Sequence, residues 1–234
     1  MTIHPSDPLR DLHSPQFEPR AANSSDARAL ALRVLLLAAS ILALLLLIRL
    51  DVPIMRRLSA YPAMASAPPL DLLRILGEYR VPTIACILAF GLDRRGLRIG
   101  AATLIASLLA LLAVQIVKDL IDRERPFRID FAANPPWNIG WHGFWWDATR
   151  RASFEAFPSG HSAAAFAVWL TLATFYPRAA PLLAALAVGA ACSRFLQWQH
   201  WPSDCLAGAL IGIGCARIGL RASARLLESR QRSP

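Results

Sequence analysis

The sequence predicts an all-α protein, an integral membrane bundle of about six transmembrane helices. Three observations lead to this fold class. Hydrophobic residues make up 55% of the 234 residues, and they occur in long blocks rather than at the spacing of an amphipathic helix or strand. The block from Ala29 to Ile48 has one charged residue, Arg33, and about 20 such residues cross a hydrocarbon core. Aromatic residues gather beside these blocks, as in an interfacial belt.

The N-terminal residues 1–28 are polar and rich in Pro, Ser, Asp and Arg, so we expect a disordered cytoplasmic tail. The apolar block that follows predicts the first span, over about residues 29–49. A cleaved signal peptide is not expected, because the charged region before this block is too long and further charges follow it. Those charges are Arg49, Asp51, Arg56 and Arg57. The first span is therefore predicted to be an uncleaved anchor.

The second span is the least regular, because its apolar run, residues 81–92, is too short to cross a bilayer alone. We expect this span to begin near Leu70, with its charged residues at the interface or facing other helices. The other four spans are predicted at about residues 100–117, 160–176, 179–196 and 203–219. Together they define a six-span domain over residues 29–221, followed by a basic cytoplasmic tail at 222–234.

The net charge of +9 does not indicate a nucleic-acid partner. Arginines cluster at the ends of the apolar blocks, where they fix orientation and contact anionic headgroups of the bilayer. Positive-inside counting favours cytoplasmic termini, although the opposite side carries comparable charge. Lys118 is the only lysine in the chain, which indicates a chemical role. The four cysteines lie in apolar blocks without metal-type spacing and are expected to be buried hydrophobes: Cys86, Cys192, Cys205 and Cys215.

Close packing is predicted for the sixth span, because Gly208 and Gly212 have the G-x-x-x-G spacing.

Three short polar blocks lie at the mouths of the predicted spans, and a six-span topology brings all three to the same side of the bundle. Their residues are Lys118, Arg125 and Pro126; Pro158, Ser159, Gly160 and His161; and Ser193, Arg194, His200 and Asp204. Singly, a histidine or an arginine near the end of a span usually lies at the interface. A mutually complementary set of ionisable groups is costly near a membrane and therefore indicates function.

The cations and the helix start of this set suit a phosphate group. Lys118, Arg125 and Arg194 can neutralise an oxyanion that carries nearly two charges, with guanidinium groups that bind two oxygens at once. Ser159 and the free N–H groups of Gly160 and His161 would add an anion site at the start of a helix.

The remaining residues suit nucleophilic catalysis. His200 is the candidate nucleophile, because a neutral imidazole attacks phosphorus well and later leaves well. Asp204 can accept the far N–H of His200 and stabilise the charge that develops. His161 is then the proton donor to the leaving alcohol and later the base that activates water.

In order and spacing, these eleven residues resemble the complete signature of the type 2 phosphatidic acid phosphatase and vanadium haloperoxidase superfamily. The resemblance covers residues 118–204 and implies an all-helical fold, no cofactor and no catalytic metal. It also implies the roles assigned above, with His200, His161 and Asp204 catalytic and Lys118, Arg125, Ser159, Gly160 and Arg194 binding phosphate. A metal site at Asp119, Asp122 and Glu124 is the weaker alternative for those carboxylates.

The function predicted on this basis is a membrane lipid phosphatase that forms a phosphohistidine intermediate. It would act on phosphatidate, phosphatidylglycerol phosphate, undecaprenyl diphosphate or lipid A phosphates, on the periplasmic face of a bacterial inner membrane. A phosphotransferase of the same family remains an alternative. The spans disfavour a soluble haloperoxidase. A catalytically silent binding or transport protein is disfavoured, because loss of function would be expected to change one of the eleven positions.

The long connection over residues 119–158 is dense in Trp and Phe. We expect residues 127–157 to lie along the membrane surface, either as a lid that guides a lipid headgroup or as an anchor for the fourth span. In the lid hypothesis Trp141, Trp145 and Trp146 contact the lipid, and Arg150 and Arg151 contact further anionic groups.

Overall fold

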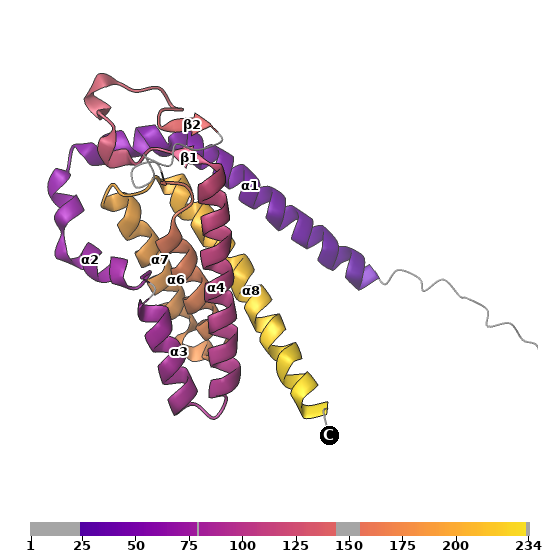
Figure 1. The fold of residues 1–234 in the computed structure, drawn as a ribbon. Helices are drawn as coiled ribbons and strands as arrows, with labels where there is room; N and C mark the ends of the chain where they lie inside the picture. The colour runs from indigo at the N-terminus through magenta and orange to yellow at the C-terminus, as the bar shows by residue number, and fades with distance from the viewer. Residues whose placement is uncertain (1–23, 79, 144–154, 233–234) are drawn as a thin grey trace, which may run out of the picture. The chain divides into compact units, whose positions relative to one another are not determined.

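The computed structural model describes residues 24–78, 80–143 and 155–232, and these residues are mostly helical (Figure 1). The α-helices are α1 (Ser24–Ser59), α2 (Pro68–Ile75), α3 (Arg80–Leu92), α4 (Gly96–Leu120), α6 (Gly160–Phe175), α7 (Ala180–Leu196) and α8 (Pro202–Arg232). Short 3-10 turns lie at Pro62–Ser66, Pro126–Arg128, Phe131–Ala133 and Pro177–Ala179. The predicted all-α class is confirmed, with a short antiparallel pair of strands added to it, β1 (Asp122–Arg123) and β2 (Trp141–Gly143).

Four helices in these ranges are long and apolar enough to cross a membrane: Ala27–Ser59, Gly96–Leu120, Pro177–Leu196 and Pro202–Glu228. Two shorter apolar helices are Thr83–Leu92 and Gly160–Phe175. α6 has 16 residues and is therefore about 24 Å long, which is less than a hydrocarbon core of about 30 Å. The predicted membrane bundle is confirmed, and its count of six is approximate because two members are short.

The chain divides at Ile41 into two compact units, residues 1–41 and residues 42–234. The tail predicted as disordered, residues 1–28, lies outside the described ranges up to residue 23, and α1 begins at Ser24. At the other end, α8 continues without a break to Arg232, through most of the segment predicted as a separate basic tail. The bundle itself belongs to the second unit.

Helix α6 is the centre of this bundle and packs on α4, α7 and α8 (Figure 1). Small side chains make the contact possible: the core between α4, α6 and α8 consists of Ala106, Ala110, Val114, Ala163, Ala167 and Cys215. A Cβ atom on Gly208 or Gly212 would collide with backbone oxygens of Ser159 and Ala163. The close packing predicted from the G-x-x-x-G spacing is confirmed, and it brings the start of α8 against the start of α6.

The predicted second span, which was expected to begin near Leu70, is divided between two helices, because α2 ends at Ile75 and α3 begins at Arg80. Pro82 explains the break: it has no N–H to donate to the carbonyl of Glu78, so it is tolerated only in the first turn of a new helix. Gly77 lies at the break, and a Cβ atom there would be 2.7 Å from the carbonyl oxygen of His161. The break therefore packs directly on the first turn of α6.

The described part of the aromatic connection is packed against the bundle more than the surface hypothesis expected. Phe131 is 5% exposed and makes edge-to-face contacts with Trp198 and Trp201. Trp141 stacks on the guanidinium group of Arg123, with 4.1 Å between the guanidinium carbon and the ring centroid. The lid residues Trp145, Trp146, Arg150 and Arg151 lie outside the described residues, so the lid remains a hypothesis.

Candidate active site

The three polar blocks meet at one end of the bundle. Lys118 is in the last turn of α4, His161 in the first turn of α6, Arg194 in the last turn of α7 and Asp204 in the first turn of α8. Since consecutive spans run in opposite directions, two helix C-termini and two helix N-termini come together there. The predicted convergence of these residues is thus seen in the structure.

His200 is held in the turn between α7 and α8 by backbone geometry. Trp198 adopts a left-handed conformation with φ of 60°, which reverses the chain so that the N–H groups of Gln199 and His200 both donate to the carbonyl of Arg194, at 3.0 and 3.3 Å. The His200 side chain is buried, and its Nδ1 lies 2.6 Å from the carbonyl oxygen of Ala156. A carbonyl only accepts, so Nδ1 carries the proton and the lone pair is at Nε2.

The surroundings keep His200 neutral. Burial lowers the pKa of its imidazole well below the ordinary value of 6.5, and the nearby charges of Arg125, Arg194 and Lys118 lower this pKa further. Arg125, Arg194 and Lys118 therefore all lie close enough to act electrostatically on the buried imidazole of His200. His161 lies within electrostatic reach of His200, Arg194 and Lys118. The site therefore holds a neutral imidazole with a free lone pair beside concentrated positive charge.

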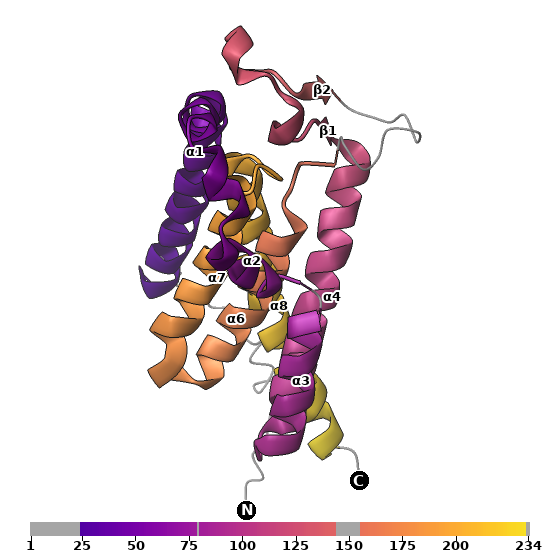
Figure 2. The same cartoon turned by 90° about the vertical axis from the view of Figure 1, so that its left-hand side faces the viewer.

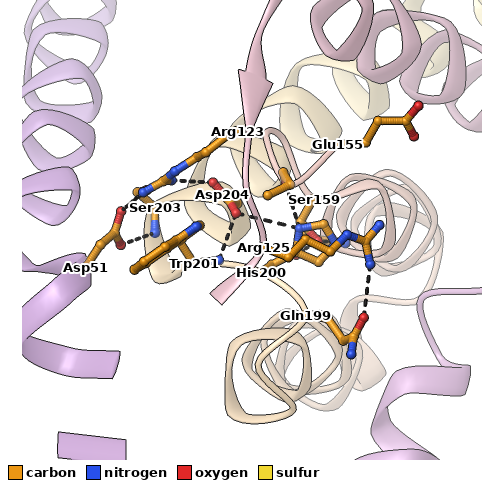
Figure 3. Close-up of polar contacts among 12 residues, drawn as sticks. Asp51, Arg123, Arg125, Glu155, Ser159, Gln199, His200, Trp201, Ser203 and Asp204 are labelled. Atoms are coloured by element: carbon orange, nitrogen blue, oxygen red, sulfur yellow. Dashed lines mark hydrogen bonds and ion pairs between the residues drawn. The ribbon is translucent and has the colours of Figure 1, made fainter. Parts of the chain in front are cut away.

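Arg125 and Arg194 are each held by a hydrogen bond to a glutamine side chain. Arg125 donates from Nη1 to the Oε1 atom of Gln199 at 3.0 Å, and Arg194 donates from Nη1 to the Oε1 atom of Gln197, also at 3.0 Å (Figure 3 shows the first pair). The Nε atoms of both arginines are buried and have no hydrogen-bond partner in the described residues. Buried donors are nearly always paired in folded proteins, so these donors fit an oxyanion that enters the site.

Lys118 and the start of α6 complete the anion site. The Nζ atom of Lys118 lies 3.9 Å from a carboxylate oxygen of Glu155. Ser159 caps α6, and its hydroxyl accepts from the N–H of Ser162 at 3.4 Å. The N–H groups of Gly160 and His161 belong to the first turn, which has no intrahelical acceptors for them. The eight predicted site residues are thus gathered around one position.

Asp204 is bound mainly to a buried network rather than to His200 (Figure 3). Its Oδ2 atom accepts from the backbone N–H of Trp201 at 2.8 Å and is 3.7 Å from Nδ1 of His200, which instead bonds to Ala156. Its Oδ1 atom accepts from Nη1 of Arg123. At 3.7 Å the carboxylate acts on the imidazole by charge and not by a hydrogen bond.

Arg123 connects Asp204 to helix α1. Its Nη2 atom lies 2.6 Å from Asp51, and its Nη1 atom donates to Ser203 at 2.7 Å. Ser203 in turn donates its backbone N–H to Asp51 at 2.9 Å. Asp51, Arg123 and Asp204 are each at most 1% exposed, and Arg123 also stacks on Trp201 at 4.8 Å. We call Asp51, Arg123, Ser203 and Asp204 the carboxylate–arginine network.

Five residues that support the site were not predicted from the sequence: Asp51, Arg123, Glu155, Gln197 and Gln199. One signal was present for Asp51, because a carboxylate at the end of an apolar block needs a partner if it is buried. The two glutamines lie beside Arg194 and His200 in the chain, but their spacing alone does not indicate which cations they hold.

Two of the three acidic residues considered as a metal site, Asp119 and Glu124, have other partners. Asp119 accepts from the amide of Gln115 at 2.9 Å, and Glu124 lies 3.8 Å from Arg128 and 3.5 Å from His142. Within the ranges that the structure covers, no group of three or more His, Cys, Asp or Glu side chains is arranged to hold a metal ion.

Comparison with known proteins places this site in a family. The model of the PAP2 superfamily matches residues 96–227, more than half of the chain, and includes every one of the eleven motif residues. The chain belongs to the PAP2 superfamily. The resemblance predicted from the motifs is therefore confirmed.

Individual relatives of this PAP2 protein match over shorter stretches. Lipid A 1-phosphatases of Rhizobium etli and Rhizobium johnstonii are 38% and 36% identical to it over 61 residues. That segment is 26% of this chain and spans only about a quarter of each relative, 26% and 25% respectively. The crystal structure of Aquifex aeolicus LpxE superimposes with a TM-score of 0.57 at 22% identity, over 74% of this chain and 95% of that one. This likeness concerns the fold.

Proposed function

We propose that this PAP2 protein is a membrane-embedded lipid phosphatase that hydrolyses a phosphomonoester or diphosphate through a phosphohistidine at His200. The observation that carries the proposal is the pair of buried, unpartnered Nε atoms of Arg125 and Arg194 beside a neutral His200. Together with Lys118, they supply a binding site for an oxyanion next to a nucleophile with a free lone pair.

In the first step, the Nε2 lone pair of His200 attacks phosphorus while the bond from phosphorus to the leaving oxygen breaks. His161 donates a proton to that oxygen, so the lipid leaves as a neutral alcohol. Phosphoryl transfer depends mainly on positioning and charge stabilisation. The three cations stabilise the phosphoryl oxygens, and the carboxylate of Asp204 stabilises the positive charge that develops on the imidazole.

In the second step, water attacks the phosphorus of the phosphohistidine. His161, deprotonated in the first step, takes a proton from that water, and the bond between phosphorus and Nε2 breaks. Inorganic phosphate is released, and His200 returns to its neutral form with the proton still on Nδ1, where the carbonyl of Ala156 holds it. No metal ion is needed in either step, because arginine and lysine side chains supply the positive charge.

The substrate we propose first is a lipid A 1-phosphate, because the name of both curated relatives is lipid A 1-phosphatase. Three other lipid phosphates of the same chemical class remain alternative substrates: phosphatidate, phosphatidylglycerol phosphate and undecaprenyl diphosphate. We propose a bacterial inner membrane as its location, with the site on the periplasmic face and both termini cytoplasmic. The six-span domain over residues 29–221 is the proposed catalytic unit.

The test is release of inorganic phosphate from purified samples of these four lipid phosphates by the detergent-solubilised protein. We expect turnover of at least one of them and loss of that turnover in His200→Ala and His161→Ala. His142→Ala is the matched control, because His142 is exposed in β2 and outside the proposed chemistry. Equal activity in wild type and His200→Ala, or no activity on any lipid phosphate, contradicts the proposal.

A further inference from the structure

A carboxylate on α1, that of Asp51, is buried next to the candidate active site. It lies in the part of α1 that belongs to the second compact unit, outside residues 96–227, which the PAP2 model matches. Its helix is apolar and long enough to cross a membrane, and its side chain is 0% exposed. An ionisable group inside such a helix is costly, so its partners indicate what it does.

Both oxygens of Asp51 are occupied by partners in β1 and at the start of α8. Oδ1 accepts from the backbone N–H of Ser203 at 2.9 Å. Oδ2 accepts from Nη2 of Arg123 at 2.6 Å and from the hydroxyl of Ser203. Figure 3 shows Arg123 between Asp51 and Asp204. Asp51 therefore acts on the site through Arg123.

The side chain of Arg123 sets the orientation of Asp204. Its Nη1 atom donates to Oδ1 of Asp204, while the backbone N–H of Trp201 donates to Oδ2 at 2.8 Å. The guanidinium group of Arg123 also contacts the rings of Trp141 and Trp201, at 4.1 and 4.8 Å from their centroids. Because both of its oxygens are held, the carboxylate cannot rotate. Its Oδ2 atom thus stays 3.7 Å from Nδ1 of His200.

The main chain of Arg123 positions the other group that faces His200, the carbonyl of Ala156. The carbonyl of Arg123 accepts from the N–H of Ala156 at 3.0 Å, and Arg123 forms a parallel bridge with Glu155. The carbonyl of Ala156 in turn accepts from Nδ1 of His200 at 2.6 Å. Arg123 belongs to β1, which lies with β2 beyond the C-terminal end of α4 (Figure 2). One residue therefore places both groups that face Nδ1.

We propose that Arg123 and Asp51 are positioning residues of the phosphatase, which orient the His200 imidazole by fixing both groups that face its Nδ1; this inference rests on the function proposed above. Attack by Nε2 requires the ring to point at phosphorus, and a misplacement of about 1 Å can slow a reaction about a hundredfold. α1 is thereby part of the catalytic unit, although Asp51 lies outside the residues that the PAP2 model matches.

The charge of Asp51 adds an electrostatic contribution. Asp51 and Asp204 are two carboxylates that share the one guanidinium group of Arg123, so the three side chains together carry one net negative charge. When Nε2 bonds to phosphorus, the imidazole becomes positively charged, and a fixed negative charge stabilises it. With a neutral residue at position 51, Arg123 would offset the charge of Asp204. Asp51 therefore preserves the charge with which Asp204 acts on His200.

The substitution Asp51→Asn tests the proposal, because it removes the charge and keeps the shape. The substrate is the radiolabelled lipid phosphate that the wild type hydrolyses fastest, with saturating enzyme in excess. The rate constant for phosphohistidine formation should fall at least tenfold, while the inhibition constant of inorganic phosphate stays within twofold. A purely structural role would lower the fraction of folded protein and leave this rate constant unchanged. An unchanged rate constant overturns the proposal.

Asp93→Asn is the matched control and should change neither constant. Asp93 also pairs with an arginine, Arg95, and accepts from a hydroxyl group, that of Tyr176. It precedes α4 and therefore lies at the end of that helix opposite Lys118. If Asp93→Asn slows phosphohistidine formation as much as Asp51→Asn does, the effect is one of general stability and the proposal fails.

A spectroscopic measurement separates this inference from the proposed function. In NMR spectra of the protein with isotope-labelled histidine rings, His200 should be a single tautomer with its proton on Nδ1, and His200→Ala identifies its resonances. The Nδ1 proton should shift upfield in Asp51→Asn and not in Asp93→Asn, because its hydrogen bond weakens when the network is disturbed. An unshifted resonance in Asp51→Asn overturns the proposal. A shifted resonance in a protein that hydrolyses no lipid phosphate supports the positioning role and contradicts the phosphatase.

Discussion

The carboxylate–arginine network provides the sharpest stability prediction. Arg123→Met removes the one cation between Asp51 and Asp204 and leaves both carboxylates buried. Truncating one partner of a buried ion pair costs about 3–5 kcal/mol. Because Arg123 serves two carboxylates that are both 0% exposed, and also stacks on Trp141 and Trp201, we expect a loss of about 5 kcal/mol. Total stabilities are about 5–15 kcal/mol, so this loss is severe.

The substitution Asp51→Asn tests whether the loss of stability in Arg123→Met comes from an unpaired buried charge. In the wild type, Asp51→Asn should cost about 1.5–3 kcal/mol, because it removes the charge from the hydrogen bond to Arg123 while its amide oxygen can still accept from Ser203. In the Arg123→Met background the same substitution removes an unpaired buried charge and should stabilise the protein by about 1–3 kcal/mol. The sign of the effect of Asp51→Asn is therefore expected to reverse.

The assay is unfolding by sodium dodecyl sulfate in mixed micelles, followed by tryptophan fluorescence, for the wild type, both single variants and the double variant. If Arg123→Met leaves no folded protein to measure, recovery of folded protein in the double variant shows that Asp51→Asn is stabilising in the Arg123→Met background. The reasoning is refuted if Asp51→Asn costs the same in both backgrounds to within about 0.5 kcal/mol, the agreement typical of independent sites.

Four further predictions concern the chemistry. A radiolabelled substrate should leave an acid-labile, base-stable label on the wild type; an equal label on His200→Ala would rule out His200 as the nucleophile. Vanadate should inhibit and EDTA should not; loss of activity in EDTA that Mg²⁺ restores would mean that a metal takes part. The pKa of the His200 imidazole in the folded protein is well below 6.5. As pH falls, the imidazole is therefore protonated in the unfolded chain before it is protonated in the folded protein. The contribution of His200 to the free energy of unfolding should thus be complete above pH 6.5 and decline below it, by up to about 1.4 kcal/mol per pH unit; an identical pH dependence in His200→Ala would contradict this. Gln199→Leu should lower kcat/KM about tenfold or more, since it removes a hydrogen bond to a charged Arg125 worth about 1.5–3 kcal/mol; an unchanged kcat/KM would mean that the glutamine does not position the arginine.

The sequence was sufficient for features that depend on local chemistry. The start of α6 at Gly160 followed from the Pro-Ser-Gly sequence before an apolar run, and Ser159 does cap that helix. The meeting of the motifs at one end followed from the alternation of span directions. The close packing of α8 followed from the absence of side chains at Gly208 and Gly212, although their spacing does not indicate that α6 is the partner. Each of these inferences needed only neighbouring residues and the direction of the chain.

Features that depend on distant pairing could not be predicted. Asp51 and Arg123 are 72 positions apart, and nothing in either segment selects the other as its partner. Asp204 was expected to hold His200, but Arg123 and Trp201 occupy its oxygens, and the carbonyl of Ala156 takes the proton of Nδ1 instead. The division of the second span into α2 and α3 was not predicted, because hydropathy does not register the missing N–H of Pro82.

The same network has a consequence for how the protein is made. Asp51 belongs to α1, which leaves the ribosome long before Ser203 and Asp204 at the start of α8. Throughout synthesis of the helices between them, the carboxylate on α1 lacks its hydroxyl partner, and until residue 123 emerges it also lacks its cation. A nascent chain therefore has an acidic group whose hydrogen bonds are completed only when α8 arrives. Chains truncated before α8 would display this group to the quality-control proteases of the membrane, while chains that include α8 would bury it.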